Sequence, residues 1–139
     1  MKLAVILLLL PTFVYAGKKA SVDSVFCGEN PSNPMISNYV VVYQKGNVLE
    51  SGSEYVEFVV KEIYYKEPVA HDTYELNSVS FKKNESGKFE IEMKSSELTL
   101  SVKTQLSEMG EGDYQLKGSV AHADWEAPEL NCYITVLED

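Results

Sequence analysis

The chain has 139 residues, and its 12 lysines against 21 acidic residues give a formal net charge of −9, with no arginine. An acidic chain without arginine is a poor match to nucleic acid or to an anionic membrane surface, because both require basic patches. The length is that of a single domain.

The first segment, residues 1–16, reads as a secretory signal. Lys2 supplies the positive start, and residues 3–10 form an apolar run that is too short to span a bilayer. Residues 14–16, Val-Tyr-Ala, resemble a cleavage site. We therefore expect a mature chain of residues 17–139, a single secreted or periplasmic β-domain with no transmembrane segment after cleavage.

Short β-favouring runs separated by turn residues make up most of the mature chain. In residues 89–94 apolar and charged residues alternate strictly, which indicates a strand with one buried and one wet face. Turns are expected at 28–34, which holds two prolines, at 45–47 and at 84–87. The predicted strands in chain order are 21–27, 39–43, 79–83, 89–94, 98–103, 114–117 and 132–137.

Residues 53–67 carry mixed signals. The apolar residues Val56, Val59, Val60 and Ile63 have helical spacing. However, eight of the eleven residues 55–65 are aromatic or β-branched, which favours a strand with a bulge near 61–62. We favour the strand, and the alternative is one helix packed on an antiparallel meander.

The predicted fold class is all-β, a single antiparallel β-sandwich or small barrel of about eight strands, with the α+β arrangement as the alternative. In an oxidising compartment the two cysteines, Cys27 and Cys132, are expected to form one disulfide. This bond would hold the first and last strands side by side. By the chain-entropy relation, a loop of this length stabilises the fold by about 4–5 kcal/mol.

Catalytic chemistry has little support in the sequence. The only histidines, His71 and His122, together with Asp124 are the candidate metal ligands. We expect His122 and Asp124 to share the core-facing side of one strand, and His71 to lie in a loop. A core-facing stripe whose polar end meets water explains the same pattern, so we predict no metal site, no cofactor, no catalytic residues and no enzyme activity.

Tyrosines are numerous, and most suit half-buried strands. Tyr64, Tyr65 and Trp125 are the candidate binding surface, because Tyr and Trp give large contact area at low entropic cost. We predict a non-enzymatic binding module that acts on a protein or envelope partner, for instance as an inhibitor. The alternatives are a small β-barrel carrier of an apolar ligand and a weak metal-dependent hydrolase.

One modification motif is present. Asn84, Glu85 and Ser86 form an acceptor sequence for N-linked glycans in a predicted turn, whereas the similar sequence at Asn30 is blocked by Pro31. The motif has meaning only in a eukaryotic secretory pathway.

Overall fold

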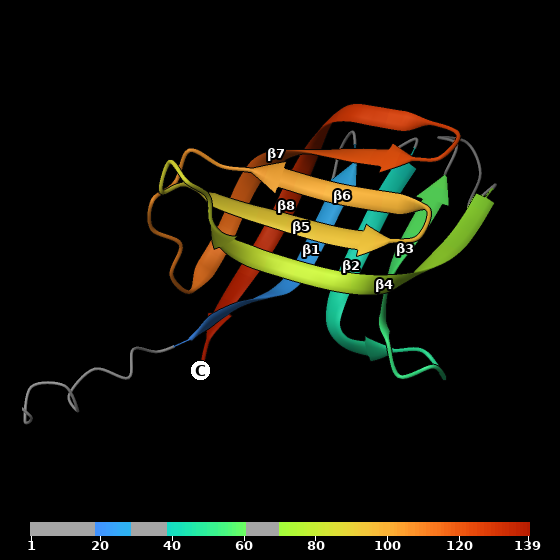
Figure 1. The fold of residues 1–139 in the computed structure, drawn as a ribbon, viewed down its shortest axis with the longest axis horizontal. Helices are drawn as coiled ribbons and strands as arrows, with labels where there is room; N and C mark the ends of the chain where they lie inside the picture. The colour runs from blue at the N-terminus through green and yellow to red at the C-terminus, as the bar shows by residue number, and fades with distance from the viewer. Residues whose placement is uncertain (1–18, 29–38, 61–69) are drawn as a thin grey trace, which may run out of the picture.

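The computed structural model describes residues 19–28, 39–60 and 70–139. These residues form eight antiparallel strands that pair in chain order and close into a barrel, with β4, β5 and β6 crossing in front of β1 and β2 (Figure 1). The strands are β1 (Ala20–Gly28), β2 (Tyr39–Val48), β3 (Glu54–Val60), β4 (Ala70–Lys83), β5 (Phe89–Ser95), β6 (Leu98–Lys103), β7 (Gly112–His122) and β8 (Glu126–Glu138). The all-β prediction is confirmed, and of its two forms, a β-sandwich or a small barrel of about eight strands, the structure is the barrel.

The alternation of side chains explains the barrel core. Ile91 and Met93 of β5 and Leu98, Leu100 and Val102 of β6 are all buried, while the residues between them face outward. Each of the eight strands contributes at least one buried apolar side chain to a single cluster. Burying these side chains is the main source of stability for a fold of this kind.

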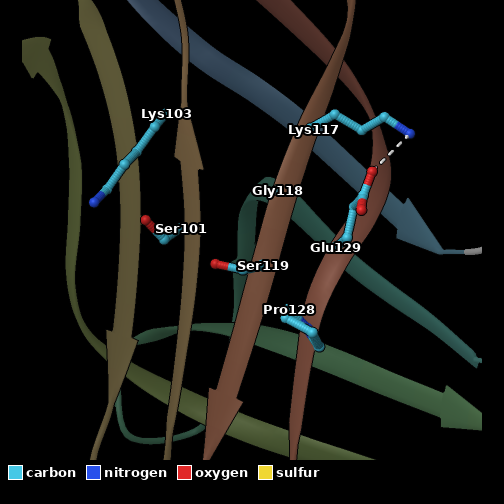
Figure 2. A pocket seen from close by; sticks show the side chains of 7 residues that line it. All are labelled: Ser101, Lys103, Lys117, Gly118, Ser119, Pro128 and Glu129. Carbon is cyan, nitrogen blue, oxygen red and sulfur yellow. Dashed lines mark ion pairs between the residues drawn. The ribbon is translucent and has the colours of Figure 1, made fainter.

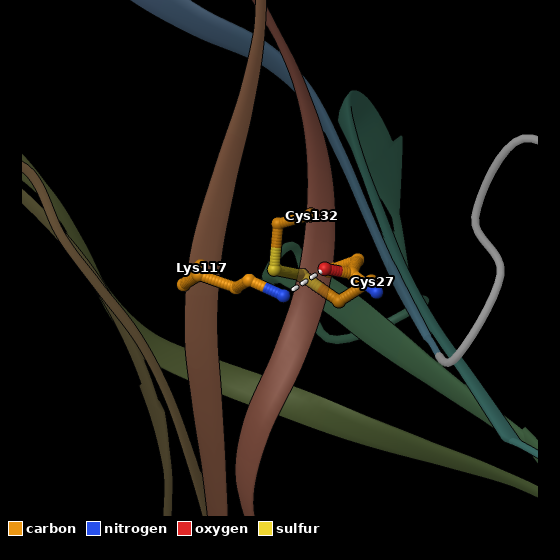
Figure 3. The surroundings of a disulfide bond; sticks show 4 residues. Cys27, Lys117 and Cys132 are labelled. Atoms are coloured by element: carbon orange, nitrogen blue, oxygen red, sulfur yellow. Dashed lines mark hydrogen bonds between the residues drawn. A yellow bond between two sulfur atoms is a disulfide. The ribbon is translucent and has the colours of Figure 1, made fainter.

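The predicted disulfide closes the barrel seam. Cys27 of β1 and Cys132 of β8 lie directly opposite each other and are bonded, so the first and last strands are held side by side (Figure 3). Both cysteines face the core, whereas Lys117 of β7 donates a hydrogen bond to Asn131 on the outer face. A buried disulfide is compatible with an oxidising compartment.

Strand β2 extends beyond the bounds that the sequence predicted, as β4, β7 and β8 also do. The turn expected at 45–47 is part of β2, and the chain turns later, where the N–H of Leu49 donates to the carbonyl of Ser53 at 2.9 Å. Gly46 instead adopts a φ of +88° where the pairing of β2 with β3 is irregular. Within the ambiguous segment, residues 54–60 are strand β3, which excludes the helix there; the bulge expected near 61–62 lies outside the described residues.

Pro128 lies inside β8, before the strand 132–137 that the sequence predicted. The pairing of β7 with β8 shifts between Gly118 and Val120, so that two residues lie between Ala127 and Leu130 of β8, where one residue lies between their partners in β7. Proline, which lacks an N–H, is tolerated in a strand at such a bulge. Strand β8 therefore includes Pro128 and starts at Glu126, directly after a short turn.

The loop 104–111 covers one end of the barrel. The N–H of Thr104 donates to the carbonyl of Phe89 at 3.0 Å, and the N–H of Phe89 donates to the carbonyl of Leu106 at 2.9 Å. Met109 is buried in the core cluster, and the hydroxyl of Tyr114 donates to the carbonyl of Gly110 at 2.8 Å. The chain itself therefore closes this end.

The buried hydroxyl of Tyr43 makes the free energy of unfolding depend on pH in the alkaline range. Its buried hydroxyl donates to Oε2 of Glu54 at 2.9 Å, and burial, then the Glu54 carboxylate, raise the pKa of Tyr43. A tyrosine whose pKa rises on folding contributes its full stabilisation at pH values below its unfolded-state pKa of about 10. This stabilisation is lost as the pH rises from there towards the folded-state pKa. We expect Tyr43 to contribute a loss of about 1.4 kcal/mol per pH unit above about pH 10.

The variant Tyr43→Phe isolates this contribution. Its free energy of unfolding should fall less steeply than that of the wild type between pH 9 and 11 in urea titrations. At pH 7 it should cost about 1–2 kcal/mol, because Glu54 loses one donor and retains the N–H of Gly46 at 3.0 Å. Tyr133→Phe, at a 40% exposed tyrosine, is the control. Identical alkaline slopes for wild type and Tyr43→Phe would contradict the prediction.

Candidate functional site

Four ring side chains gather at the end of the barrel opposite loop 104–111. Phe58 comes from β3, Tyr74 from β4, His122 from the end of β7 and Trp125 from the turn between β7 and β8. Trp125 stacks on Phe58, with ring centroids 4.6 Å apart, and on His122, at 5.0 Å. The ring of Tyr74 meets His122 edge-on at 5.6 Å. We call these four residues the aromatic cluster.

Strand periodicity brings three of the rings together. Phe58 is the next inward residue after the buried Val56 in β3, and Val56 pairs with Tyr74 in β4. His122 is the next inward residue after Val120 in β7. Among the described residues the cluster is therefore the outermost layer of the barrel interior, and all four of its residues are half-buried.

The fourth ring is positioned by a tight turn. The N–H of His122 donates to the carbonyl of Trp125 at 2.8 Å, and the N–H of Asp124 donates to Nδ1 of His122 at 3.1 Å. These two bonds fold Trp125 back over the imidazole. Because Nδ1 is an acceptor, the ring proton of neutral His122 lies on Nε2.

Carboxylates surround the cluster. Oε2 of Glu97, in the turn between β5 and β6, lies 3.9 Å from Nε2 of His122, and the His122 side chain is only 10% exposed. Burial raises the pKa of Tyr74, and the negative charges of Asp72, Glu97 and Asp124 raise it further. The aromatic cluster therefore lies within a rim of negative charge.

The structure does not bring the three candidate metal ligands together. His71 is in β4 rather than in a loop, and it faces outward, where its Nε2 lies 3.6 Å from Oε1 of Glu57. His122 faces inward as expected, but Asp124 lies in the turn after β7, not on the strand. Among the described residues no three His, Cys, Asp or Glu side chains are grouped so as to hold a metal ion.

Of the three candidate binding residues, only Trp125 is among the residues that the structure describes. Tyr64 and Tyr65 lie outside the described residues. Trp125 lies at the end of the barrel as part of the aromatic cluster, together with Phe58 and Tyr74, which sequence reasoning did not single out. Their inward position at the same end of neighbouring strands is the signal that would have found them.

A separate hollow of about 300 Å³ lies on the outer wall over β6, β7 and β8 (Figure 2). It forms where the small side chains of Ser101 and Ser119 leave room beside Pro128. Lys117 at its edge pairs with Glu129 at 3.6 Å, in an exposed position. Exposed pairs of this kind contribute little energy, and we assign no function to the hollow.

Comparison of the chain with known protein families, curated proteins and solved structures finds no match. No helix among residues 19–28, 39–60 and 70–139 is long and apolar enough to cross a membrane.

Proposed function

We propose that the chain is a non-enzymatic, exported binding protein that engages a protein or envelope partner through the end of the barrel that carries the aromatic cluster. An inhibitor of a secreted enzyme is one form that such a protein takes. The predicted signal at 1–16 and the buried disulfide between Cys27 and Cys132 support secretion or delivery to the periplasm.

The observation that carries the proposal is the aromatic cluster itself. Trp and Tyr are the side chains that most often dominate the binding energy of interfaces, where they lie centrally within a polar rim. Here Trp125 and Tyr74 are half-buried at one end of the barrel, surrounded by Asp72, Glu97 and Asp124. This arrangement favours a partner that presents an apolar centre with basic groups around it.

Truncation of Trp125 tests the proposal. With mature protein under oxidising conditions, Trp125→Ala should weaken capture of the partner by about 30-fold or more, since a central interface tryptophan contributes about 2 kcal/mol. The matched control is Tyr133→Ala, because Tyr133 is a 40% exposed aromatic residue on the wall of β8. Equal capture by the two variants, or no specific partner for the wild type, would overturn the proposal.

A second variant separates binding from folding, because Trp125 also packs against Phe58. Glu97 is 62% exposed, so Glu97→Lys should leave the free energy of unfolding almost unchanged. If the partner is basic, this charge reversal should still weaken capture, mainly by slowing association at low salt. Capture that is insensitive to Glu97→Lys would contradict the charge complementarity.

A small-ligand carrier is the alternative, and it requires a closed barrel such as this one, since barrels of eight strands hold at most one small ligand. In the described part of the chain, buried side chains from all eight strands occupy the interior below the aromatic cluster. A ligand would therefore lie among the rings, next to Trp125. Extraction of natively purified protein followed by mass spectrometry should recover it, and an empty extract would remove this alternative.

A further inference from the structure

The hairpin between β4 and β5 places a modification motif at an exposed tip. The N–H of Asn84 donates to the carbonyl of Lys88 at 2.8 Å, and the N–H of Gly87 donates to the carbonyl of Asn84 at 3.0 Å. Gly87 has a φ of +77°, which suits glycine and lets the chain reverse. Glu85 and Ser86, at the tip, are exposed.

The side chain of Asn84 is held by both of its polar atoms. Its Oδ1 accepts hydrogen bonds from the N–H of Ser86 at 2.9 Å and from the N–H of Lys88 at 3.1 Å. Its Nδ2 donates to Oε1 of Glu90 at 3.0 Å. The oxygen thus organises the turn, whereas the nitrogen makes a single contact with the side chain of a neighbouring strand.

We propose that Asn84 carries an N-linked glycan. In the transfer, Nδ2 of Asn84 attacks the anomeric carbon of a lipid-diphosphate-linked oligosaccharide. A carbon–nitrogen bond forms, the bond from that carbon to the diphosphate oxygen breaks, and the lipid diphosphate leaves with the electron pair. The amide gives up one proton to a base on the transferring enzyme and keeps the other. The inference rests on the export that the proposed function includes, in its form as secretion through a eukaryotic secretory pathway.

The folded hairpin accommodates the product. The two hydrogen bonds that Oδ1 of Asn84 accepts are unchanged by the transfer, and Nδ2 retains one N–H for Glu90. The sequence holds no second unblocked motif, because Pro31 follows Asn30. The glycan would therefore occupy one position.

The position also leaves the proposed binding end free. The β4–β5 hairpin lies at the end of the barrel closed by loop 104–111, where Phe89 is hydrogen-bonded to Thr104 and Leu106. The aromatic cluster lies at the opposite end. A bulky, hydrated sugar at Asn84 would shield the closed end without covering Trp125.

The test uses the full chain, with its own residues 1–16, expressed in cultured eukaryotic cells. Both the medium and the cell lysate are treated with an amidase that cleaves between asparagine and the first sugar and leaves aspartate at the site. We expect a downward shift in apparent mass of the wild type, and the Asn-to-Asp conversion at residue 84 by peptide mass spectrometry.

Three variants show whether the change in apparent mass after amidase treatment comes from a glycan at Asn84. Asn84→Gln and Ser86→Ala should both lose it completely, and Ser86→Ala keeps the side-chain bonds of Asn84, because Ser86 donates through its backbone. The control is Asn77→Gln, an exposed asparagine at the bulge of β4 outside any motif, which should shift like the wild type.

The outcomes separate the inference from its premise. A chain that is secreted but unaffected by the amidase overturns glycosylation at Asn84 and leaves export standing. A chain that stays in the cell with residues 1–16 attached and without sugar overturns both. Binding through Trp125 is measured independently, on protein with or without the glycan.

Discussion

Replacing both Cys27 and Cys132 with alanine is expected to lower the free energy of unfolding by about 4 kcal/mol. The bond joins residues separated by 105 positions, so its loss frees almost the whole folded chain in the unfolded state. Both side chains are essentially inaccessible to solvent and belong to the core, so their removal also costs packing. Urea unfolding at pH 7 measures the difference.

The reduced wild type separates the two contributions. Protein unfolded, reduced and refolded with reductant present keeps both sulfur atoms and loses only the cross-link. If chain entropy dominates, reduced wild type and the double alanine variant should be destabilised almost equally. A loss below about 1 kcal/mol in the reduced wild type would show that strand pairing alone holds the β1–β8 seam.

The strands that form the wall of the barrel could be predicted from the sequence, because the pattern that indicates a strand involves only neighbouring residues. The alternation in 89–94 predicted β5, and the turn residues 84–87 predicted the hairpin, since both depend only on neighbouring residues. The closure of the sheet into a barrel could not be predicted from the sequence. A disulfide between Cys27 and Cys132 implies adjacent first and last strands, but a sandwich satisfies that condition as well.

The sequence predicted only one residue of the aromatic cluster, because the cluster is assembled from segments that are far apart in the chain. Trp125 was identified from its residue type, but its partners Phe58 and Tyr74 are ordinary inward positions whose register sets them beside it. The placement of His71 was wrong because the strand begins at Ala70. The placement of Asp124 on the same strand as His122 was wrong because β7 ends at His122, and Asp124 lies in the three-residue turn that follows.

Replacing Gly118 with alanine is expected to destabilise the fold by about 2 kcal/mol, the usual cost of overfilling a packed core. Gly118 lies in β7 beside the disulfide, at the wall shown in Figure 2. A Cβ atom there would lie 2.7 Å from Sγ of Cys132, 3.0 Å from Cγ2 of Val102 and 3.1 Å from the carbonyl oxygen of Ser101. A cross-linked sulfur and a backbone oxygen are not free to move aside, so the strands themselves must separate.

Two comparisons make this a test of the sulfur contact rather than of glycine in general. Gly110→Ala places its Cβ 3.2 Å from a carboxylate oxygen of Glu138, a flexible side-chain end, and should change the free energy of unfolding by less than about 0.5 kcal/mol. Adding Gly118→Ala to the double cysteine-to-alanine variant should cost less than half of what it costs in the wild type, because Sγ is gone. An equal cost in both backgrounds would place the conflict on Val102 and Ser101, and would mean that Gly118 does not serve to accommodate the disulfide.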